Sequence, residues 1–540
     1  MSRLLRTAFV TLLFCLTGLG GCASLPPPQP RAPVQALADP ESTALGKFVA
    51  ANAPAPGISG FRVLSSGDDA FAALIALADR AQKTLDLQYY LIHSDESSRA
   101  LMQRVRAAAD RGVRVRLLID DLNTAGQDDA LMRLTQHPRI EVRLYNPFPS
   151  GRIATLSRVM ASLTDAGRIN HRMHNKMFVA DNALASTGGR NLGDAYFVQS
   201  AQSNFLDIDV LVAGPAVRAL SAVFDGFWND PLAYPIGIVT GQPAAAASTT
   251  ATPDTPATPA SEASAPDPAA SALAGEAAAS APAIVAAAAK SSLGSELARN
   301  QLKLVWAPSR VLADKPTKAS APATEEAPAA PQEVISDDVE GLLRGARSEI
   351  VLISPYFVPG ARGMALIEDL KRRGVHLRVL TNSLATTDAP AVHIGYARYR
   401  EQMLKAGIEL RELRVHLDLP RSKVGSFGSS QASLHAKVLV IDQRDVLIGS
   451  MNMDPRSARL NTEMGVVMHS PEIARQMLQL YDEVSSTNSY RLSLDPDGRL
   501  LWTLTPPGGP PKVLASEPEA SLWLKLTVKL LSPFAPEEML

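Results

Sequence analysis

Cysteine is nearly absent from this 540-residue chain, which contains only Cys15 and Cys22. Cys15 lies in an N-terminal apolar segment that we expect to be removed, so only one cysteine remains in the mature chain. A single cysteine forms no disulfide within the chain, and the folded part must therefore be stabilised by its hydrophobic cores. The length is sufficient for two such cores with connecting segments.

An excess of charge of one sign is missing as well. The 53 lysines and arginines are balanced by 54 aspartates and glutamates, which gives a formal net charge of −1. Proteins dedicated to nucleic-acid binding usually carry a basic face, so this balance argues against that class. We therefore expect no nucleic-acid partner, although a local basic patch is compatible with the composition.

The apolar run near the N-terminus, residues 7–19, is shorter than the ~20 residues that a membrane-spanning helix requires. Arg3 and Arg6 precede it as a basic region, which is the pattern of an export signal. Residues 1–21 are therefore predicted to be a signal peptide and are excluded from the fold.

The end of this segment, Leu19-Gly20-Gly21-Cys22, resembles a bacterial lipobox. The resemblance implies lipidation of Cys22 and a membrane-anchored lipoprotein that faces the periplasm. It does not distinguish the inner from the outer membrane. An ordinary signal peptide followed by a chance cysteine is the alternative. Residues 22–45 are rich in proline and polar residues, and this composition predicts a tether.

Two parts of the chain repeat the same order of predicted elements. Residues 83–92, 97–112 and 113–120 read as strand, helix and strand, which favours a right-handed crossover and parallel pairing. The pattern returns at 348–383, where Gly374 ends the helix as Gly112 does in the first copy. The two glycines are 262 residues apart, and the motif histidines described below are 261 apart. This nearly constant offset indicates an internal duplication.

The predicted fold class is α/β, with two similar halves that each contain a mixed β-sheet flanked by helices. Segments dominated by Ala, Pro, Ser and Thr lack the large apolar residues that would offset the entropy of ordering, and they are predicted to be disordered inserts. The resulting organisation is a first half over 46–240, a mostly disordered insert over 241–300, a second half over 301–495 with a disordered stretch at 314–333, and a membrane-proximal C-terminal tail over 496–540.

Each half carries a histidine and a lysine two residues apart inside an apolar run. The first set is His174, Lys176 and Asp181, and the second is His435, Lys437 and Asp442. Residues i and i+2 of a strand point to the same face, so each half presents an imidazole and an ammonium on one surface. Burying these groups is costly without a partner. If the halves pack about a pseudo-twofold axis, the two pairs converge on one pocket that suits an anion.

The same spacing of small and amide residues follows each motif. Asn191 ends the sequence Gly188-Gly189-Arg190-Asn191, and Ser450 and Asn452 lie in the matching Gly449-Ser450-Met451-Asn452. Amides and hydroxyls are donors suited to phosphate oxygens. An acidic residue then lies in the next strand of each half, Asp207 and Glu463, and can fix the tautomer of an imidazole. Asp209 is an alternative to Asp207.

The pattern H-x-K-x4-D-x6-G-[GS]-x-N, present twice, is similar to the signature of the phospholipase D superfamily. The resemblance implies two halves related by a pseudo-twofold axis and a phosphohistidine intermediate. By the habit of the superfamily, His174 would be the nucleophile and His435 the general acid and base. The lysines, asparagines and Ser450 would stabilise the phosphate oxygens, so no metal or other cofactor is expected.

In the same reading the motif aspartates, Asp181 and Asp442, are structural residues at strand ends. Segments such as residues 353–363, 381–400 and 449–465 resemble bacterial cardiolipin synthases. That branch implies transfer of a phosphatidyl group between phosphatidylethanolamine and phosphatidylglycerol. The internal pseudo-twofold symmetry predicts a monomer, and the lipobox at Cys22 predicts the membrane anchor. The alternatives are a phospholipase D that hydrolyses phospholipids, a phosphodiesterase or nuclease of the same fold, and an inactive envelope scaffold.

The last apolar segment, residues 521–534, contains Leu522, Trp523 and Leu526 beside Lys525. As a helix it is partly amphipathic, and Trp and Lys suit a lipid interface. A helix packed on the domain is the equal alternative.

Overall fold

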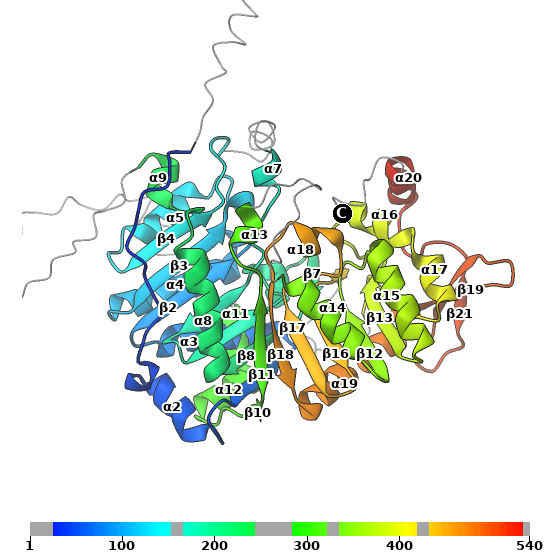
Figure 1. Cartoon of the computed structure of the whole chain (residues 1–540), viewed down its shortest axis with the longest axis horizontal. Helices are drawn as coiled ribbons and strands as arrows, with labels where there is room; N and C mark the ends of the chain where they lie inside the picture. Colours follow the sequence, from blue (N-terminus) through cyan, green and yellow to red (C-terminus); the bar gives the residue numbers. More distant parts are fainter. Residues whose placement is uncertain (1–24, 153–165, 243–282, 321–333, 418–430, 533–540) are drawn as a thin grey trace, which may run out of the picture.

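The protein folds into two α/β halves that lie side by side, each built on one large mixed β-sheet (Figure 1). The computed structural model describes residues 25–152, 166–242, 283–320, 334–417 and 431–532. The predicted fold class, two halves with mixed sheets flanked by helices, is confirmed.

The first sheet contains nine strands in the order β10-β1-β8-β6-β5-β2-β3-β4-β9, and only the neighbours β2-β3-β4 run parallel. Its strands are β1 (Ser59–Leu64), β2 (Thr84–Tyr89), β3 (Arg114–Asp120), β4 (Ile140–Tyr145), β5 (Met177–Ala180), β6 (Leu184–Gly188), β8 (Asp209–Ala213), β9 (Ala233–Pro235) and β10 (Val305–Ala307). The helices of this half are α2 (Ala44–Asn52), α3 (Gly67–Arg80), α4 (Glu96–Asp110), α5 (Asp128–Thr135), α7 (Ala166–Ile169), α8 (Pro215–Trp228), α9 (Ile236–Thr240), α11 (Ala283–Lys290) and α12 (Ser292–Ala298), with short 3-10 turns η1 (Pro40–Ser42), η2 (Asp121–Asn123) and η3 (Asp194–Phe197).

The second sheet contains ten strands in the order β11-β18-β17-β16-β12-β13-β14-β19-β20-β21, with β12-β13-β14 parallel. Its strands are β11 (Ser309–Ala313), β12 (Glu349–Ile353), β13 (His376–Asn382), β14 (Glu409–Leu413), β16 (Val438–Ile441), β17 (Asp445–Gly449), β18 (Met464–His469), β19 (Ser489–Leu494), β20 (Leu500–Leu504) and β21 (Lys512–Leu514). The helices are α13 (Thr317–Ser320), α14 (Ile335–Gly345), α15 (Gly360–Arg372), α16 (Pro390–Ala397), α17 (Arg400–Lys405), α18 (Pro455–Arg459), α19 (Pro471–Thr487) and α20 (Leu522–Leu531).

The repeat inferred from the sequence appears in the order of the strands. The run β8-β6-β5-β2-β3-β4 in the first sheet corresponds to β18-β17-β16-β12-β13-β14 in the second. The helices α4 and α15 stop before Gly112 and Gly374, which have φ angles of 101° and 72° in the left-handed region that glycine adopts at little cost. The strand that follows each glycine then pairs in parallel with the strand before the helix.

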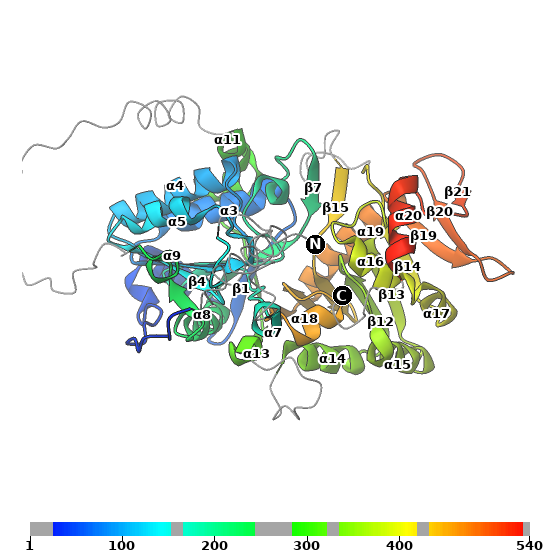
Figure 2. The ribbon, with the colours of Figure 1, turned by 90° about the horizontal axis from the view of Figure 1, so that it is seen from above.

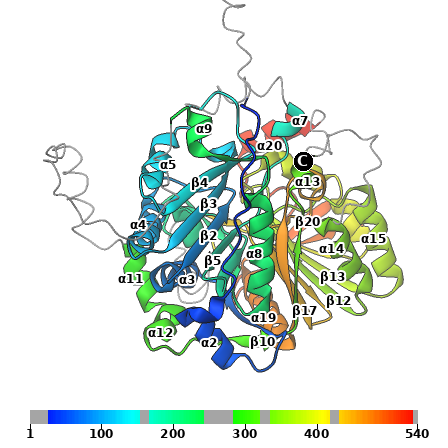
Figure 3. The ribbon, with the colours of Figure 1, turned by 60° about the vertical axis from the view of Figure 1, so that its left-hand side comes forward.

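One hydrophobic cluster joins the two halves. Val179 and Val212 from the first sheet belong to the same cluster as Val440 and Val466 from the second. The helix α8 carries the fully buried Trp228 into this cluster and packs against strands of both sheets, β8 and β11 (Figure 3). Burying each such side chain contributes roughly 1.5–3 kcal/mol. The halves are thereby held in one fixed arrangement, as a site shared between them requires.

The prediction of disorder over 241–300 is wrong for its last part. Residues 283–298 form α11 and α12, which pack on α3. Leu293 is fully buried, and its amide donates to Asp69 over 2.8 Å. The alanine-rich composition hides a few large apolar residues at helical spacing, and these are sufficient to dock the segment. Residues 243–282 lie outside the described part of the chain.

The predicted disordered stretch 314–333 also begins too early. Asp314, just after β11, and Lys318 on α13 are both buried and form an ion pair of 2.8 Å. The Asp314 carboxylate further accepts from the amide of Glu463 over 2.9 Å, which ties this segment to the second half. A buried pair with additional hydrogen bonds orders a segment that its composition alone assigns to disorder. Residues 321–333 lie outside the described part.

The predicted tether over 22–45 is docked on the first half for much of its length. Arg31 donates to the carbonyl of Ala233 over 2.7 Å, and the amide of Ala36 donates to Asp225 on α8 over 2.7 Å. The predicted tail over 496–540 is likewise partly integrated, since β20 and β21 extend the second sheet. Residues 1–24, with the predicted signal peptide and Cys22, lie outside the described part. Among the described residues, no helix combines the length and apolar character needed to cross a membrane.

The motif aspartates hold the sheets together at strand ends. The Asp181 carboxylate, fully buried, accepts hydrogen bonds of 2.8–2.9 Å from the amides of residues 82–84, where β2 begins. Asp442 does the same for the amides of residues 347–349 at the start of β12, with distances of 2.8–3.1 Å. Both aspartates have φ near 50°, a region that Asp and Asn enter more readily than other residues. Each therefore fixes the strand next to its own motif.

We predict that Asp181→Ala lowers the free energy of unfolding by about 1–3 kcal/mol, because the buried amide of Thr84 loses its acceptor. Urea unfolding of the full chain measures this loss. Asp442→Ala is the matched control, and a smaller effect is expected because the amides bound to Asp442 are more exposed. Equal losses in the two variants would contradict the role of burial.

Candidate active site

Each motif histidine is held by a carboxylate from the opposite half. His174 Nδ1 lies 2.9 Å from an oxygen of Glu463, and His435 Nδ1 lies 2.6 Å from an oxygen of Asp207. All four side chains are buried. Each carboxylate accepts a hydrogen bond from the Nδ1–H of its imidazole. This contact orients the ring and leaves the lone pair of Nε2 available. The sequence indicated these acids, but not that the pairs cross between the halves.

The backbone around both histidines is built in the same crossed way. The amide of His174 donates to the carbonyl of Thr462 over 2.9 Å, one residue before Glu463. The amide of His435 donates to the carbonyl of Leu206 over 2.8 Å, one residue before Asp207. On the second side this contact extends into a parallel ladder between β7 (Ser203–Leu206) and β15 (Gln431–Leu434). Each imidazole is therefore fixed against its acid by main-chain contacts as well as by its hydrogen bond to the carboxylate.

The two motif lysines are buried behind the histidines. Lys176 Nζ donates to the carbonyl of His174 over 2.6 Å, and Lys437 donates to the carbonyl of His435. Burial lowers the pKa of Lys176 to about 7. The charge of Glu463 opposes this shift, and the charge of Lys437 adds to it. Two ammonium groups within reach of one another disfavour each other's charge. An anion bound between them would relieve this repulsion, as expected for a phosphate site.

The two histidine–carboxylate pairs differ in their electrostatics. Burial lowers the pKa of His174 well below its usual value, with help from Lys176 and Lys437. Burial also raises the pKa of its partner Glu463 to about 7. In the other pair burial opposes ionisation of Asp207, but the charges of His435 and Lys437 outweigh it and lower the pKa of Asp207 to about 2. The carboxylate of Asp207, the partner of His435, is therefore firmly ionised, whereas that of Glu463, the partner of His174, is not.

The predicted phosphate donors have partners of their own. Ser450 Oγ donates to Glu463 over 2.5 Å, so its hydroxyl supports the carboxylate that holds His174. Asn191 donates through Nδ2 to the hydroxyl of Tyr196 over 3.0 Å, and its buried Oδ1 has no partner among the described residues. The buried Oδ1 of Asn452 is likewise without a described partner. The sequence spacing placed Ser450, Asn191 and Asn452 near the motifs. It did not predict that Ser450 binds Glu463, because this contact forms only in the folded chain.

Asp209, the alternative to Asp207, has a different partner. Its carboxylate lies 3.2 Å from Arg190 and accepts the Arg190 amide over 3.1 Å. Residues two positions apart in an extended chain point to the same face. The sequence pattern therefore did not distinguish Asp207 from Asp209. The choice of Asp207 follows from the crossing of the halves.

Aromatic rings surround the histidines, and sequence reasoning identified few of them. Tyr90 packs edge-on against His174 with ring centroids 4.9 Å apart, and its ring lies 5.5 Å from Lys176 Nζ. Tyr196 and Phe205 contact His435 at 5.3 and 5.1 Å. Tyr90 lies near the end of the strand predicted over 83–92, whereas no motif in the sequence marks Tyr196 or Phe205. The rings exclude water and lower the local dielectric constant around the imidazoles.

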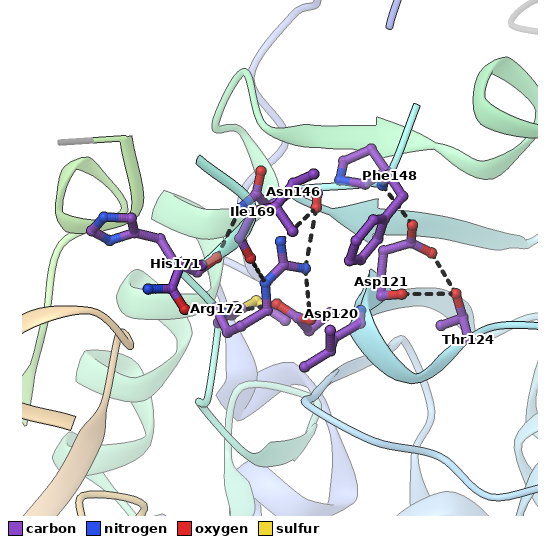
Figure 4. Close-up of polar contacts among 12 residues, drawn as sticks. Asp120, Asp121, Thr124, Asn146, Phe148, Ile169, His171 and Arg172 are labelled. Carbon is purple, nitrogen blue, oxygen red and sulfur yellow. Dashed lines mark hydrogen bonds and ion pairs between the residues drawn. The ribbon is translucent and has the colours of Figure 1, made fainter. Parts of the chain in front are cut away.

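A buried network fixes the segment that leads to His174 (Figure 4). Arg172 is fully buried and lies 3.2 Å from the equally buried Asp120 at the end of β3. The other oxygen of Asp120 accepts the amide of Met173 over 2.8 Å, and Arg172 also donates to the carbonyls of Ile169 and Asn146. Removing one member of such a pair leaves a buried charge without compensation. The network therefore sets the position of the backbone immediately before the first motif.

Two α/β halves that contribute one histidine, one lysine and one carboxylate each to a shared site define the phospholipase D-like class. The chain belongs to the PLD-like domain family of cardiolipin synthases, because the family model described as "Cardiolipin synthase, PLD-like domain" matches residues 74–228 and 339–484. The first range includes His174 and Asp207, and the second includes His435 and Glu463. Among the described residues, no group of three or more His, Cys, Asp or Glu is arranged to hold a metal ion.

Known proteins with similarity to the chain agree with this family. Cardiolipin synthase C of Escherichia coli K12 is 38% identical over 488 residues, which covers 90% of this chain and 97% of that protein. A cardiolipin synthase of Geobacillus kaustophilus is 23% identical and covers 77% of this chain and 64% of its own length. The crystal structure of phosphatidylserine synthase from Haemophilus influenzae Rd KW20 superposes with a TM-score of 0.53 at 14% identity, covering 92% of this chain and all of that one, which shows a shared fold.

We predict that Glu463→Gln and Asp207→Asn each lower kcat by at least about 100-fold, because each histidine loses the carboxylate that orients its ring. Release of nitrophenol from a chromogenic phosphodiester measures this rate. Asp209→Asn is the matched control, since Asp209 contacts Arg190 and neither histidine, and a loss under about tenfold is expected. A loss as large in the control would contradict the assignment of Asp207.

A second prediction concerns pH and the buried Asp454, which caps α18 through the amide of Ser457 at 2.7 Å. Burial raises the pKa of Asp454 to about 7, with the charge of Glu463 adding to it. The folded state therefore binds this proton more tightly than the unfolded state does. The resulting stabilisation is complete below the unfolded pKa near 3.8 and is lost as the pH rises through 7.

We predict that Asp454→Asn, which keeps an acceptor for the cap, loses this dependence. The free energy of unfolding of the variant minus that of wild type should therefore be larger at pH 8 than at pH 4. Urea unfolding at a series of pH values measures the difference. A difference that is constant between pH 4 and 8 would contradict the prediction.

Proposed function

We propose that the protein transfers a phosphatidyl group from one phospholipid to another and so forms cardiolipin. The observation that carries the proposal is the shared site itself, in which two carboxylate-held imidazoles lie beside two buried lysines. The similarity to cardiolipin synthase C supports a phospholipid substrate. We propose phosphatidylethanolamine as the donor and phosphatidylglycerol as the acceptor. The balanced net charge argues against nucleic-acid substrates.

The electrostatics support His174 as the nucleophile. Its pKa is held well below the usual value, so the imidazole is neutral at physiological pH and Nε2 can attack phosphorus. The bond from phosphorus to the oxygen of ethanolamine then breaks as the bond to His174 forms. Lys176 and Lys437 are near enough to His174 for their charges to lower its pKa, so they would stabilise the negative charge that develops on the phosphate oxygens.

His435 suits the role of acid and base. Burial lowers the pKa of His435 and the charge of Lys437 adds to this shift, but its partner Asp207 opposes it. Asp207 remains ionised, since its pKa is lowered to about 2, and an ionised carboxylate stabilises the imidazolium as it forms. His435 would give its proton to the departing ethanolamine oxygen. It would then take the proton from a hydroxyl of phosphatidylglycerol as that oxygen attacks the phosphohistidine and releases His174. The two half-reactions leave the enzyme unchanged.

Hydrolysis by water would follow the same path with water in place of the alcohol. The rings of Tyr90, Tyr196 and Phe205 around the histidines favour transfer, because they restrict water at the reacting atoms. We propose further that the chain acts as a monomer, since one chain supplies both halves of the site. Lipidation of Cys22 would anchor the enzyme in the membrane on its periplasmic side, close to its substrates.

The test of the proposed reaction is a product assay with phosphatidylethanolamine and phosphatidylglycerol in mixed micelles, read by mass spectrometry. We predict cardiolipin and free ethanolamine with the wild-type protein, and neither product with His174→Ala or His435→Ala. Phosphatidic acid without cardiolipin would mean that water is the acceptor and would contradict the transferase proposal. Equal turnover by wild type and His174→Ala would contradict the two-histidine mechanism.

The assignment of the two histidines has its own test. Phosphatidyl-nitrophenol has a leaving group that needs no proton, so His435→Asn should release one equivalent of nitrophenol and then stop. We predict that the trapped adduct, quenched in alkali and analysed by peptide mass, is on His174. His174→Asn should show no burst and no adduct. An adduct on His435 in the wild-type protein would reverse the assignment.

A further inference from the structure

Exposed apolar side chains are concentrated near the C-terminus. Among the described residues, the large hydrophobic side chains that are exposed are Ile238, Val513, Leu514, Leu522, Trp523, Leu526, Leu530 and Leu531. Five of these eight lie on the single helix α20, where Leu522 is 85% and Trp523 76% exposed. Such clustering on one surface element marks an interaction site, because isolated exposed apolar residues are otherwise scattered.

The exposed residues of α20 form one face with a cationic edge. Leu522, Leu526 and Leu530 follow each other at intervals of four and therefore lie along one side of the helix. Lys525 and Lys529 have the same interval and lie beside this stripe. Leucines with a tryptophan and flanking lysines match the interface of an anionic bilayer, where the acyl boundary takes the apolar groups and the headgroups take the ammonium groups.

The helix is held rigidly with this face outward. Glu517, shortly before α20, pairs with the buried Arg400 at 2.5 Å, and Arg400 in turn lies 3.1 Å from the buried Glu412. Glu519 accepts the amide of Val415 over 2.9 Å. At its other end, the carbonyl of Ser532 accepts from Arg398 over 2.8 Å. A segment tied down at both ends and still exposing leucines is prepared for a partner outside the chain.

The face of α20 belongs to the same side of the molecule as the active site. The histidines lie at the ends of the parallel strands, next to α7 and α18. Figures 1 and 3 show α7 at the top of the molecule at the level of α20, and Figure 2, seen from above, shows α7, α18 and α20. The connection is also direct, because α20 packs on α16. Burial lowers the pKa of His435, and the charge of Asp388, just before α16, is near enough to oppose this shift.

The start of the described chain lies on this side too. The carbonyl of Pro26 accepts from the hydroxyl of Tyr234 over 3.2 Å, next to α9 with its exposed Ile238. Residue 25 comes three positions after Cys22. Figures 1 and 3 show α9 and the first described residues at the top, the level of α20.

We infer that α20 is an interfacial helix that inserts its leucine and tryptophan face into an anionic phospholipid bilayer and orients the active-site side toward the lipid surface. The inference rests on the proposed function, because a phospholipid substrate places the bilayer in front of the active site. Burial of Leu522, Trp523, Leu526 and Leu530 below the headgroups gives the binding energy, and Lys525 and Lys529 give the preference for phosphatidylglycerol.

The test uses full-length protein and vesicles of phosphatidylethanolamine and phosphatidylglycerol with brominated acyl chains, which quench tryptophan on contact. The signal of Trp523 is the difference between wild type and Trp523→Phe, and we expect most of it to be quenched. Trp306→Phe is the matched control, since the half-buried Trp306 lies on β10 at the opposite end of the molecule (Figure 1). An unquenched Trp523 in vesicle-bound protein would overturn the inference.

A second measurement separates the inference from the proposed function. We expect Leu526→Gln with Leu530→Gln to lower turnover on vesicles by about tenfold or more and to leave turnover of monomeric short-chain phospholipids unchanged. Equal turnover on vesicles would overturn the interfacial role. An inactive wild type whose Trp523 is still quenched would contradict the function alone. Self-association in solution that the double variant abolishes, with Trp523 unquenched, would assign the face to a second copy and overturn the inference.

Discussion

The hydrogen bond between each imidazole and a carboxylate of the opposite half is the constraint on which the rest of the structure depends. His174 is held by Glu463 and His435 by Asp207, so neither half contains a complete catalytic group. The arrangement requires the halves to keep a fixed relative position to within a fraction of an ångström. The hydrophobic cluster shared by both sheets and the contacts of Thr462 and Leu206 with the histidine backbones meet this requirement.

The buried charges follow from the same constraint. Lysines behind the histidines are costly in the absence of an anion, and the low pKa of Lys176 reflects that cost. Contacts in the surrounding framework offset this cost. Among them are the hydrogen bonds of Asp181 to the start of β2 and the ion pair of Arg172 with Asp120. The difference between Glu463 and Asp207 then gives two chemically equivalent motifs two different proton affinities. A duplicated sequence can in this way supply a nucleophile from one copy and an acid from the other.

The region after the second motif connects this site to the surface. The buried Arg400 and Glu412, together with the partly exposed Glu517, fix the C-terminal segment against the second half. This leaves α20 at the surface on the active-site side, with its apolar residues outward. For an enzyme with membrane lipids as substrates, such a surface would orient the site and raise the local substrate concentration, so that tight binding of single lipids is not required.

The sequence by itself determined the duplication, the two mixed sheets and the motif positions, because strand and helix periodicity and residue spacing are local properties. It also indicated the acids Asp207 and Glu463 by their place in the following strand. Composition misjudged Asp314–Ser320 and residues 283–300, because a few buried contacts with distant elements outweigh a disorder-prone average. Which carboxylate serves which histidine, the partner of Ser450 and the rings of Tyr196 and Phe205 were decided only by the tertiary structure. These contacts join residues hundreds of positions apart or depend on how the halves cross, and no local pattern encodes that geometry.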